Sequence, residues 1–373
     1  MTGRASDGNE SSLDGASVDC VRAAIESGDP LSGTRGFAGA VDDRLVRDVL
    51  GRYPCFTERD DPTTWSFDPT ELDQPESVPA GHGRTAEGDQ RVWSLPDVPT
   101  IEDDEAAVAT VRASIDASLD EVVADSLAIA FSGGVDSALL AARLDAPLYV
   151  VGFPDSHDVE AAQSAAASLD RDVRVVEVTH DDVVRAVPEV ATAIGRTNAM
   201  DVQIALPLYL VAERVADDGY DRLAVGQGAD ELFGGYAKVA KAPTDPRVDA
   251  DTVRGATREV IQSLPDQLER DVLTLRAAGV EPVAPLLHDR VVEAALQLPG
   301  HMLVTEPGDD GVRKHALRRA ASEWLPDEIA TRDKKAVQYG SLIARELDRL
   351  ARQNGFKRRM DDHVTKYVES LLA

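Results

Sequence analysis

Residues 127–137 of this chain read Leu127-Ala128-Ile129-Ala130-Phe131-Ser132-Gly133-Gly134-Val135-Asp136-Ser137, and this stretch decides the fold. Its first five residues are apolar and indicate a buried strand, and the helix-forming residues 138–144 follow its serines and glycines. A tight loop therefore joins a strand to the N-terminus of a helix. Glycines let backbone N–H groups approach an anion closely, serines add hydroxyl donors, and the helix end favours negative charge. The stretch predicts a phosphate-binding loop; the alternative is a plain tight turn between a buried strand and a helix.

A second glycine-rich segment lies at residues 226–236, which read Gly226-Gln227-Gly228-Ala229-Asp230-Glu231-Leu232-Phe233-Gly234-Gly235-Tyr236. Both segments carry an aspartate. Asp136 would repel a bare phosphate, so its place in the loop predicts a magnesium ion between the carboxylate and the phosphate. Asp230 offers a second carboxylate of the same kind.

The composition of the chain limits the kinds of partner that it is expected to bind. The chain has 373 residues, 43% of them hydrophobic, which predicts about two domains with a sizeable core. Its formal net charge of −28 disfavours unspecific binding to nucleic acid or to anionic membranes, because the average field repels phosphate. We therefore expect small molecules or proteins as partners; no membrane partner is expected, and nucleic acid is disfavoured.

The basic residues are almost all arginine, since lysine occurs only at seven positions. An acidic surface with little lysine resembles proteins from salt-loving cytosols, where charge keeps a chain soluble at high ionic strength. The alternative is an ordinary acidic enzyme. Cys20 and Cys55 are the only cysteines, so no disulfide framework is expected. No apolar run is long enough to cross a bilayer and the first twelve residues are polar, which predicts a cytoplasmic protein.

The sequence predicts three regions: a short helical N-terminus at residues 1–30, a small β-rich domain at residues 31–99 and an α/β domain at residues 100–373. In the third region, strands are expected at residues 126–131, 147–152, 173–178 and 222–225. Helices at residues 135–144, 159–169, 181–194 and 204–217 separate them. This alternation is typical of a parallel sheet covered on both faces, and both acidic segments would follow the carboxyl ends of its strands, where ligands bind. Beyond residue 249 the pattern predicts only helices, at residues 252–263, 266–277, 289–297, 312–324 and 341–352.

The first loop resembles the pyrophosphate loop of the N-type ATP pyrophosphatases, whose fold is adenine nucleotide α-hydrolase-like. The second segment resembles the Ser-Gly-Glu-Gly-Ser-Asp-Glu-Leu-Phe-Gly-Gly-Tyr signature of asparagine synthetases and the related β-lactam synthetases. Residues 150–158 resemble the family's second-strand stretch, and Lys314-His315-Ala316-Leu317-Arg318-Arg319-Ala320 resembles its Lys-Tyr-Leu-Leu-Arg-Lys-Ala helix. These ordered matches imply a ligase that converts ATP to AMP and pyrophosphate.

The resemblance also implies roles for individual residues. Pyrophosphate and Mg²⁺ would be held by Ser132, Gly133, Gly134, Asp136 and Ser137, with Asp230 as the second metal ligand. The adenosine of ATP would be lined by Phe131, Val151, Gly152, Val225 and Gly226. Lys314 would neutralise charge on the adenylated intermediate or the departing phosphate, and Gln227 and Lys335 complete the candidate catalytic residues. The alternative for Lys314, and for one of the pair Lys334 and Lys335, is a solvated helix face.

Residues 45–54, 78–82 and 91–93 resemble segments of class II glutamine amidotransferase domains. That family uses an N-terminal cysteine as its nucleophile, whereas Met1 is followed here by Thr2. We therefore expect a truncated glutaminase-like domain that cannot hydrolyse glutamine, so that the amine comes from ammonia or from a separate glutaminase subunit.

At two positions the chain departs from the asparagine synthetase pattern, and both departures concern the acceptor substrate. Gln227 stands where asparagine synthetases usually carry glutamate, and Val283 stands where they carry arginine. The predicted function is an ATP-dependent amide-forming ligase that adenylates aspartate or a similar carboxylate. Two alternatives stay open: adenylation of another acceptor, such as a different carboxylate or a tRNA nucleoside, and a regulatory protein that binds ATP without turnover.

Overall fold

The computed structural model describes residues 13–154, 156–242, 244–332 and 341–372, and the chain divides into two compact units. The first unit comprises residues up to 122 together with 226–269 and 284–324. The second unit comprises residues 123–225, 270–283 and those from 325 onward. The predicted domain limits at residues 30, 99 and 100 come from sequence pattern alone and stay a prediction.

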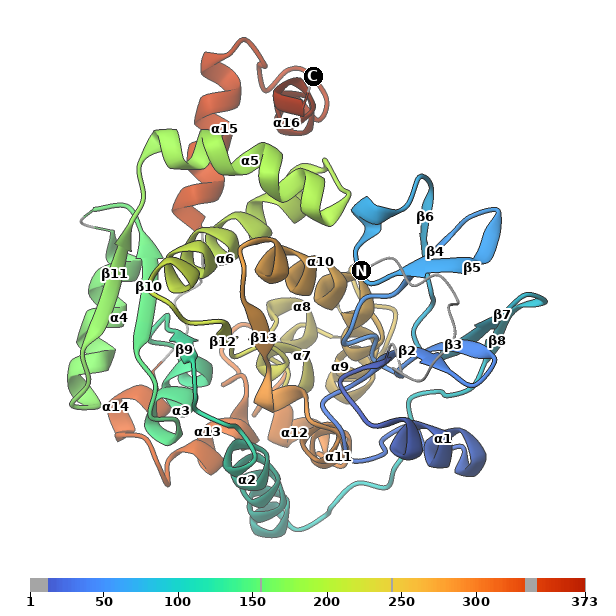
Figure 1. Cartoon of the computed structure of the whole chain (residues 1–373). Helices are drawn as coiled ribbons and strands as arrows, with labels where there is room; N and C mark the ends of the chain where they lie inside the picture. Colours follow the sequence, from blue (N-terminus) through green and yellow to red (C-terminus); the bar gives the residue numbers. More distant parts are fainter. Residues whose placement is uncertain (1–12, 155, 243, 333–340, 373) are drawn as a thin grey trace. The chain divides into compact units, whose positions relative to one another are not determined.

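The second unit is built on a sheet of five parallel strands in the order β11-β10-β9-β12-β13 (Figure 1). Its strands are β9 (Leu127–Ala130), β10 (Leu148–Gly152), β11 (Val173–Glu177), β12 (Arg222–Ala224) and β13 (Glu281–Val283). The predicted parallel sheet and the first four of these strands are confirmed. β9 and β10 are buried along almost their whole length, as expected for a strand covered on both faces.

Helices connect these strands in the predicted alternation. They are α3 (Val135–Arg143), α4 (His157–Ser168), α5 (His180–Ile194) and α6 (Ala199–Asp217), and α14 (Asp327–Ala330), α15 (Ser341–Gln353) and α16 (His363–Leu372) follow later in the chain. The chain moves outward from β9 through β10 to β11 and then returns to β12. Because such crossovers are right-handed, the helices of the outward and return paths lie on opposite faces of the sheet.

One strand contradicts the prediction that residues beyond 249 are purely helical. β13 pairs with β12, placing Val283 beside Ala224. Its three residues, Glu281-Pro282-Val283, are too few and too mixed to show a strand pattern. Pro282 cannot donate a backbone hydrogen bond, but β13 lies at the edge of the sheet, where this loss is tolerated.

The first unit contains the predicted β-rich region, which forms two antiparallel sheets in the orders β1-β2-β3-β7-β8 and β5-β4-β6. The strands are β1 (Leu13–Asp14), β2 (Ala38–Val41), β3 (Arg44–Arg47), β4 (Phe56–Glu58), β5 (Asp61–Ser66), β6 (Pro75–Ser77), β7 (His82–Thr85) and β8 (Gly88–Arg91). Helix α1 (Val18–Ser27) packs here through Val21 and Ala24, beside an edge-to-face pair of Phe37 and Trp93. The indole of Trp93 donates to the carbonyl of Ala24, so its one polar group is satisfied.

The helices of the first unit are mostly short. They are η1 (Pro69–Glu71), α2 (Asp104–Asp120), α7 (Ala229–Leu232), α8 (Ala237–Ala240), α9 (Val253–Gln262), η2 (Pro285–Leu287), α11 (Asp289–Leu296), α12 (Gly300–Leu303) and α13 (His315–Ala321), while α10 (Leu264–Ala277) is divided between the units at residue 269. The helix predicted at residues 312–324 begins only at His315, so its first turn was wrong. Arg313 instead forms an antiparallel bridge with Val304, and Lys314 takes a left-handed conformation with φ of 58°.

Candidate active site

The loop after β9 is closed by its own serines. The backbone N–H of Ser132 donates to the hydroxyl of Ser137 at 3.2 Å, and that hydroxyl donates to the carbonyl of Gly134 at 3.2 Å. Gly134 is the residue before α3, and no side chain accepts the first N–H groups of this helix. Ser132 and Gly134 are both exposed. An anion at this helix end would therefore meet backbone donors and a hydroxyl, which is the arrangement that phosphate binding needs.

Two glycines let this region approach α4 closely. Gly133 has φ of +73°, and a Cβ atom added there would lie 2.9 Å from the carbonyl oxygen of Ala161. A Cβ atom on Gly152, at the end of β10, would lie 2.8 Å from Val159. Larger residues at either position would push α4 away from the carboxyl edge of the sheet.

The strand order reverses between β9 and β12, because β10 and β11 extend from β9 in one direction and β13 lies on the far side of β12. In parallel sheets a ligand binds beyond the carboxyl ends of the strands at such a switch point. Ser132 lies two residues after the end of β9, and Val225 directly follows β12. The side chains of Phe131, Val151 and Val225 are buried, which leaves backbone groups as their means of contact with a ligand.

The second acidic segment lies in the first unit, where Asp230 and Lys314 form an ion pair. Lys314 Nζ lies 2.9 Å from Asp230 Oδ1, and the lysine side chain is only 3% exposed, against 23% for Asp230. The solvated-surface alternative for Lys314 is therefore wrong. A compact cation held in a largely dry place is suited to neutralising a developing anion.

Gly235 makes this ion pair sterically feasible. A Cβ atom there would lie 2.5 Å from Lys314 Cε and closer still to the carboxylate of Asp230. The backbone fixes the same residue, because its N–H donates to the carbonyl of Asp230 at 2.7 Å and its carbonyl accepts from Arg313 at 2.8 Å. Neither Gly235 nor Arg313 was predicted to be a site residue, although the double glycine before Tyr236 was an available signal.

Glu231 is a further buried acid in this segment. The hydroxyl of Tyr236 donates to its carboxylate, and burial raises the pKa of Glu231 above its usual range. The segment from Asp230 to Tyr236 is thus closed by both a backbone and a side-chain hydrogen bond.

Magnesium would find hard oxygen ligands in this chain, because Asp136 and Asp230 are both carboxylates. Among the described residues, no group of three or more His, Cys, Asp or Glu side chains lies close enough to bind a metal ion. Such a cluster is not required, since Mg²⁺ usually takes one or two carboxylates together with substrate phosphates. Each of the two carboxylates has the hard oxygen chemistry that Mg²⁺ prefers.

The other residues predicted for the site lie partly inside and partly outside the described residues. Gln227 lies in the turn before α7 and is half-buried, as is Gly226. Lys335 and Lys334 lie outside the described residues. Val283, at the position where the resemblance expects arginine, is a buried strand residue whose carbonyl accepts from Val225 at 2.9 Å.

The two cysteines of the chain differ in burial. Burial raises the pKa of the Cys55 thiol to about 12, so its thiolate is scarce at neutral pH. Cys20 is partly exposed on α1. Arg47, from the segment that resembles glutamine amidotransferases, donates to Tyr53, Ser77, Val78, Gly51 and Glu269.

In the described part of the chain, every helix is too short or too polar to span a membrane. Comparison with known proteins identifies the family that the chain resembles. The family model for asparagine synthase matches residues 110–259 and 237–371.

Individual relatives agree with this match. A putative glutamine-hydrolysing asparagine synthetase 1 of Methanocaldococcus jannaschii is 33% identical over 273 residues, covering 64% of this chain and 50% of the relative. Asparagine synthetase B of Escherichia coli is 27% identical over 192 residues, covering 52% and 34% of the two chains. The human asparagine synthetase is 30% identical over 224 residues, covering 56% and 38%. The matches thus span half or less of each of these relatives, and the chain belongs to the asparagine synthase family.

Proposed function

We propose that this chain is an ATP-dependent amide-forming ligase of the asparagine synthetase type. A carboxylate oxygen of the substrate would attack the α-phosphorus of ATP, breaking the bond to pyrophosphate. Ammonia or another amine would then attack the acyl carbon and release AMP. The observation that carries the proposal is the buried ion pair of Lys314 and Asp230, in a family member that also keeps an open helix end after β9.

The loop of Ser132, Gly133, Gly134 and Ser137 would bind the phosphates that leave. Its support is the uncapped N-terminus of α3, which offers backbone N–H groups and a favourable dipole. The backbone at Phe131, Val151, Gly152, Val225 and Gly226 would line the adenosine. Asp136 and Asp230 would hold Mg²⁺, whose contribution when bound is to neutralise charge on the phosphates.

Lys314 would supply a positive charge that stabilises the negative charge developing on pyrophosphate as it departs. A fixed cation in a water-poor site stabilises such charge more strongly than an exposed one, because little solvent has to reorganise. Asp230 and Gly235 hold the ammonium group in place, so its position does not depend on the substrate. Gln227 and Lys335 are further candidates for contact with the reacting groups.

The acceptor is proposed as aspartate or a similar carboxylate. An amino-acid acceptor carries both a carboxylate and an ammonium group, and partners of opposite charge recognise them best. Gln227 and Val283 replace the glutamate and the arginine that the family resemblance leads us to expect. Carboxylates without an α-amino group therefore belong in any screen beside aspartate. Ammonia is the proposed amine, with a separate glutaminase subunit as a candidate supplier.

The test is ATP–pyrophosphate exchange over a panel of carboxylates, followed by amide formation with ammonium. We expect exchange that depends on one carboxylate and on magnesium. Replacement of Lys314 by methionine should lower the exchange rate about 100-fold, the usual effect of losing one preorganised stabilising group. Lys241→Met is the matched control, because Lys241 is 40% exposed and pairs with the exposed Asp309.

The results of these assays distinguish the proposed ligase from the regulatory alternative. ATP binding without exchange for any carboxylate would overturn the ligase and favour the regulatory alternative. Equal loss in the two lysine variants would remove Lys314 from the mechanism. Circular dichroism of both variants shows whether either loss reflects unfolding.

A further inference from the structure

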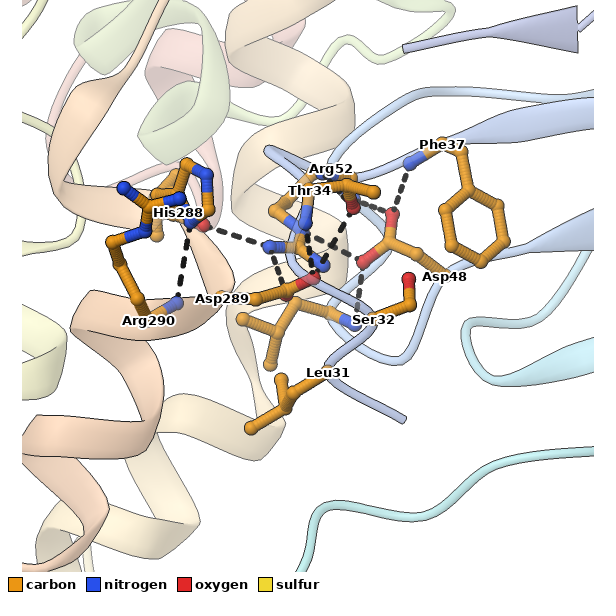
Figure 2. A network of polar contacts seen from close by, with 12 residues as sticks. Leu31, Ser32, Thr34, Phe37, Asp48, Arg52, His288, Asp289 and Arg290 are labelled. Carbon is orange, nitrogen blue, oxygen red and sulfur yellow. Dashed lines mark hydrogen bonds and ion pairs between the residues drawn. The ribbon is translucent and has the colours of Figure 1, made fainter. Parts of the chain in front are cut away.

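Arg52 lies almost completely buried between two carboxylates (Figure 2). Its Nε donates to Asp48 Oδ1 at 2.8 Å, and its Nη1 lies 2.7 Å from Asp289 Oδ1. The same Nη1 donates to the carbonyl of Leu287 at 2.7 Å. One guanidinium group thus joins the turn after β3 to the segment that links η2 to α11.

Both carboxylates are themselves held by backbone donors. Asp48 accepts from the N–H groups of Leu50 and Arg52, each at 2.9 Å, and Asp289 accepts from the N–H of Thr34 at 2.8 Å. Burying a charge is costly unless it is paired, and each charged group here has an ion partner of opposite sign and at least one hydrogen bond. Arg52 thus links the carbonyl of Leu287 to the turn after β3.

Leu287 in turn contacts the acidic segment. A Cβ atom added to Gly228 would lie 2.6 Å from Leu287 Cδ2 and 2.9 Å from its Cγ, so the side chain lies directly against the backbone of Gly228. Gly228, with φ of +90°, is the residue before α7, the short helix that carries Asp230. Arg52 is thereby connected to the ion pair of Asp230 and Lys314 through one hydrogen bond and one packed side chain.

We propose that Arg52 is a positioning residue for the proposed adenylation reaction: it fixes Leu287 against Gly228 and so sets the place of Asp230 and Lys314. The inference rests on the proposed function. It gives the β-rich region a part in ATP chemistry that is separate from any amide hydrolysis.

Two variants test the two contacts that join Arg52 to the Asp230 segment: the hydrogen bond to Leu287 and the packing of Leu287 on Gly228. Arg52→Lys keeps the charge but loses the planar fork that reaches Asp48, Asp289 and Leu287 together. Leu287→Ala keeps the ion network but removes the side chain that touches Gly228. In each variant we expect kcat for pyrophosphate release, measured at saturating ATP and Mg²⁺, to fall about tenfold.

The matched controls are Arg47→Lys and Leu45→Ala. Arg47 is as buried as Arg52 and is also ion-paired, but its carboxylate partner is Glu269. Leu45 is a buried leucine in the core of the β-rich region. Both controls should lower thermal stability without changing kcat at a temperature where the protein is folded.

Hydrogen exchange supplies a readout that does not need activity. Exchange of the amides at residues 228–236 should accelerate about tenfold in Arg52→Lys and in Leu287→Ala, and stay unchanged in the two controls. If the wild-type protein releases no pyrophosphate, the proposed function fails. Amide hydrogen exchange alone then decides whether Arg52 positions the Asp230 segment. Unchanged exchange in Arg52→Lys, or equal acceleration in Arg47→Lys, would overturn the proposal.

Discussion

Replacing Gly235 by alanine is the smallest change that disturbs the proposed catalytic pair. The added Cβ atom would lie 2.5 Å from Lys314 Cε and 2.7 Å from Asp230 Cα, and closer still to the carboxylate of Asp230. The φ angle of Gly235 lies outside the left-handed region, so alanine meets no backbone strain there. The effect of the substitution is steric and falls on the side chain of Lys314 and on both the carboxylate and the backbone of Asp230.

The size of the effect follows from these contacts. The carboxylate must move by roughly 1.5 Å to regain ordinary van der Waals distance. Overpacking of this kind costs about 1–3 kcal/mol of unfolding free energy. Complete loss of a buried pair would cost about 3–5 kcal/mol, but Asp230 is 23% exposed and water can take part of its charge, so we expect the lower range.

The catalytic effect should be larger than the loss of stability suggests. Lys314 is 3% exposed and would have to leave the place that the ion pair gives it. A displaced stabilising group lowers kcat by about 100-fold. Urea denaturation measures the change in stability, and single-turnover pyrophosphate release at saturating ATP measures the chemical step.

Gly255→Ala is the control for a steric change elsewhere. Its Cβ atom would lie 2.8 Å from the Cβ atom of Ala250, in a contact of similar tightness at the start of α9. This variant should lose stability and keep its kcat. A Gly235→Ala protein with wild-type stability and wild-type kcat would refute the account of the Asp230 loop.

Two other predictions concern solution conditions. Burial lowers the pKa of His288 from the usual 6.5 to about 4, so between these values the unfolded chain binds a proton that the folded chain does not, and stability rises with pH. His288→Asn keeps an acceptor for the N–H of Arg290 and should flatten the plot of unfolding free energy against pH by up to about 1.4 kcal/mol per pH unit; an unchanged slope would contradict this. The net charge of −28 predicts that raising KCl to about 1 M increases both the unfolding midpoint and the activity, and full folding and activity without salt would exclude a salt-adapted protein.

Two strands of the parallel sheet were predictable because each is a short apolar run that ends at or near a glycine and precedes a helix. The run before Ser132 and the run ending at Gly152 both have this form, and both are strands. β13 could not be predicted in the same way. Its three residues form a strand only because β12 offers an edge beside them, which is a tertiary cause.

The candidate site was predictable in part. Scarcity of lysine pointed to Lys314, and its burial agrees with that expectation. Its left-handed conformation was not foreseen, because the surrounding residues follow a helical pattern and only the bridge of Val304 with Arg313 delays the helix. The bond from Arg52 to Leu287 joins positions 235 residues apart, and local sequence carries no sign of it.

The same long-range bonds lead us to expect that the synthetase-like part cannot fold stably without the β-rich region. A fragment beginning at residue 100 would lose Arg52 and Arg47, whose partners Asp289 and Glu269 are 2% and 10% exposed. Breaking one buried pair costs about 3–5 kcal/mol, so two such losses approach the whole stability of a typical domain. Thermal melting by circular dichroism measures this, and a fragment with a cooperative transition near that of the full chain would refute it. Neutral partners at both sites, Asp289→Asn and Glu269→Gln, should restore part of the lost stability, because they remove the unpaired charges while leaving the shape of the fragment unchanged.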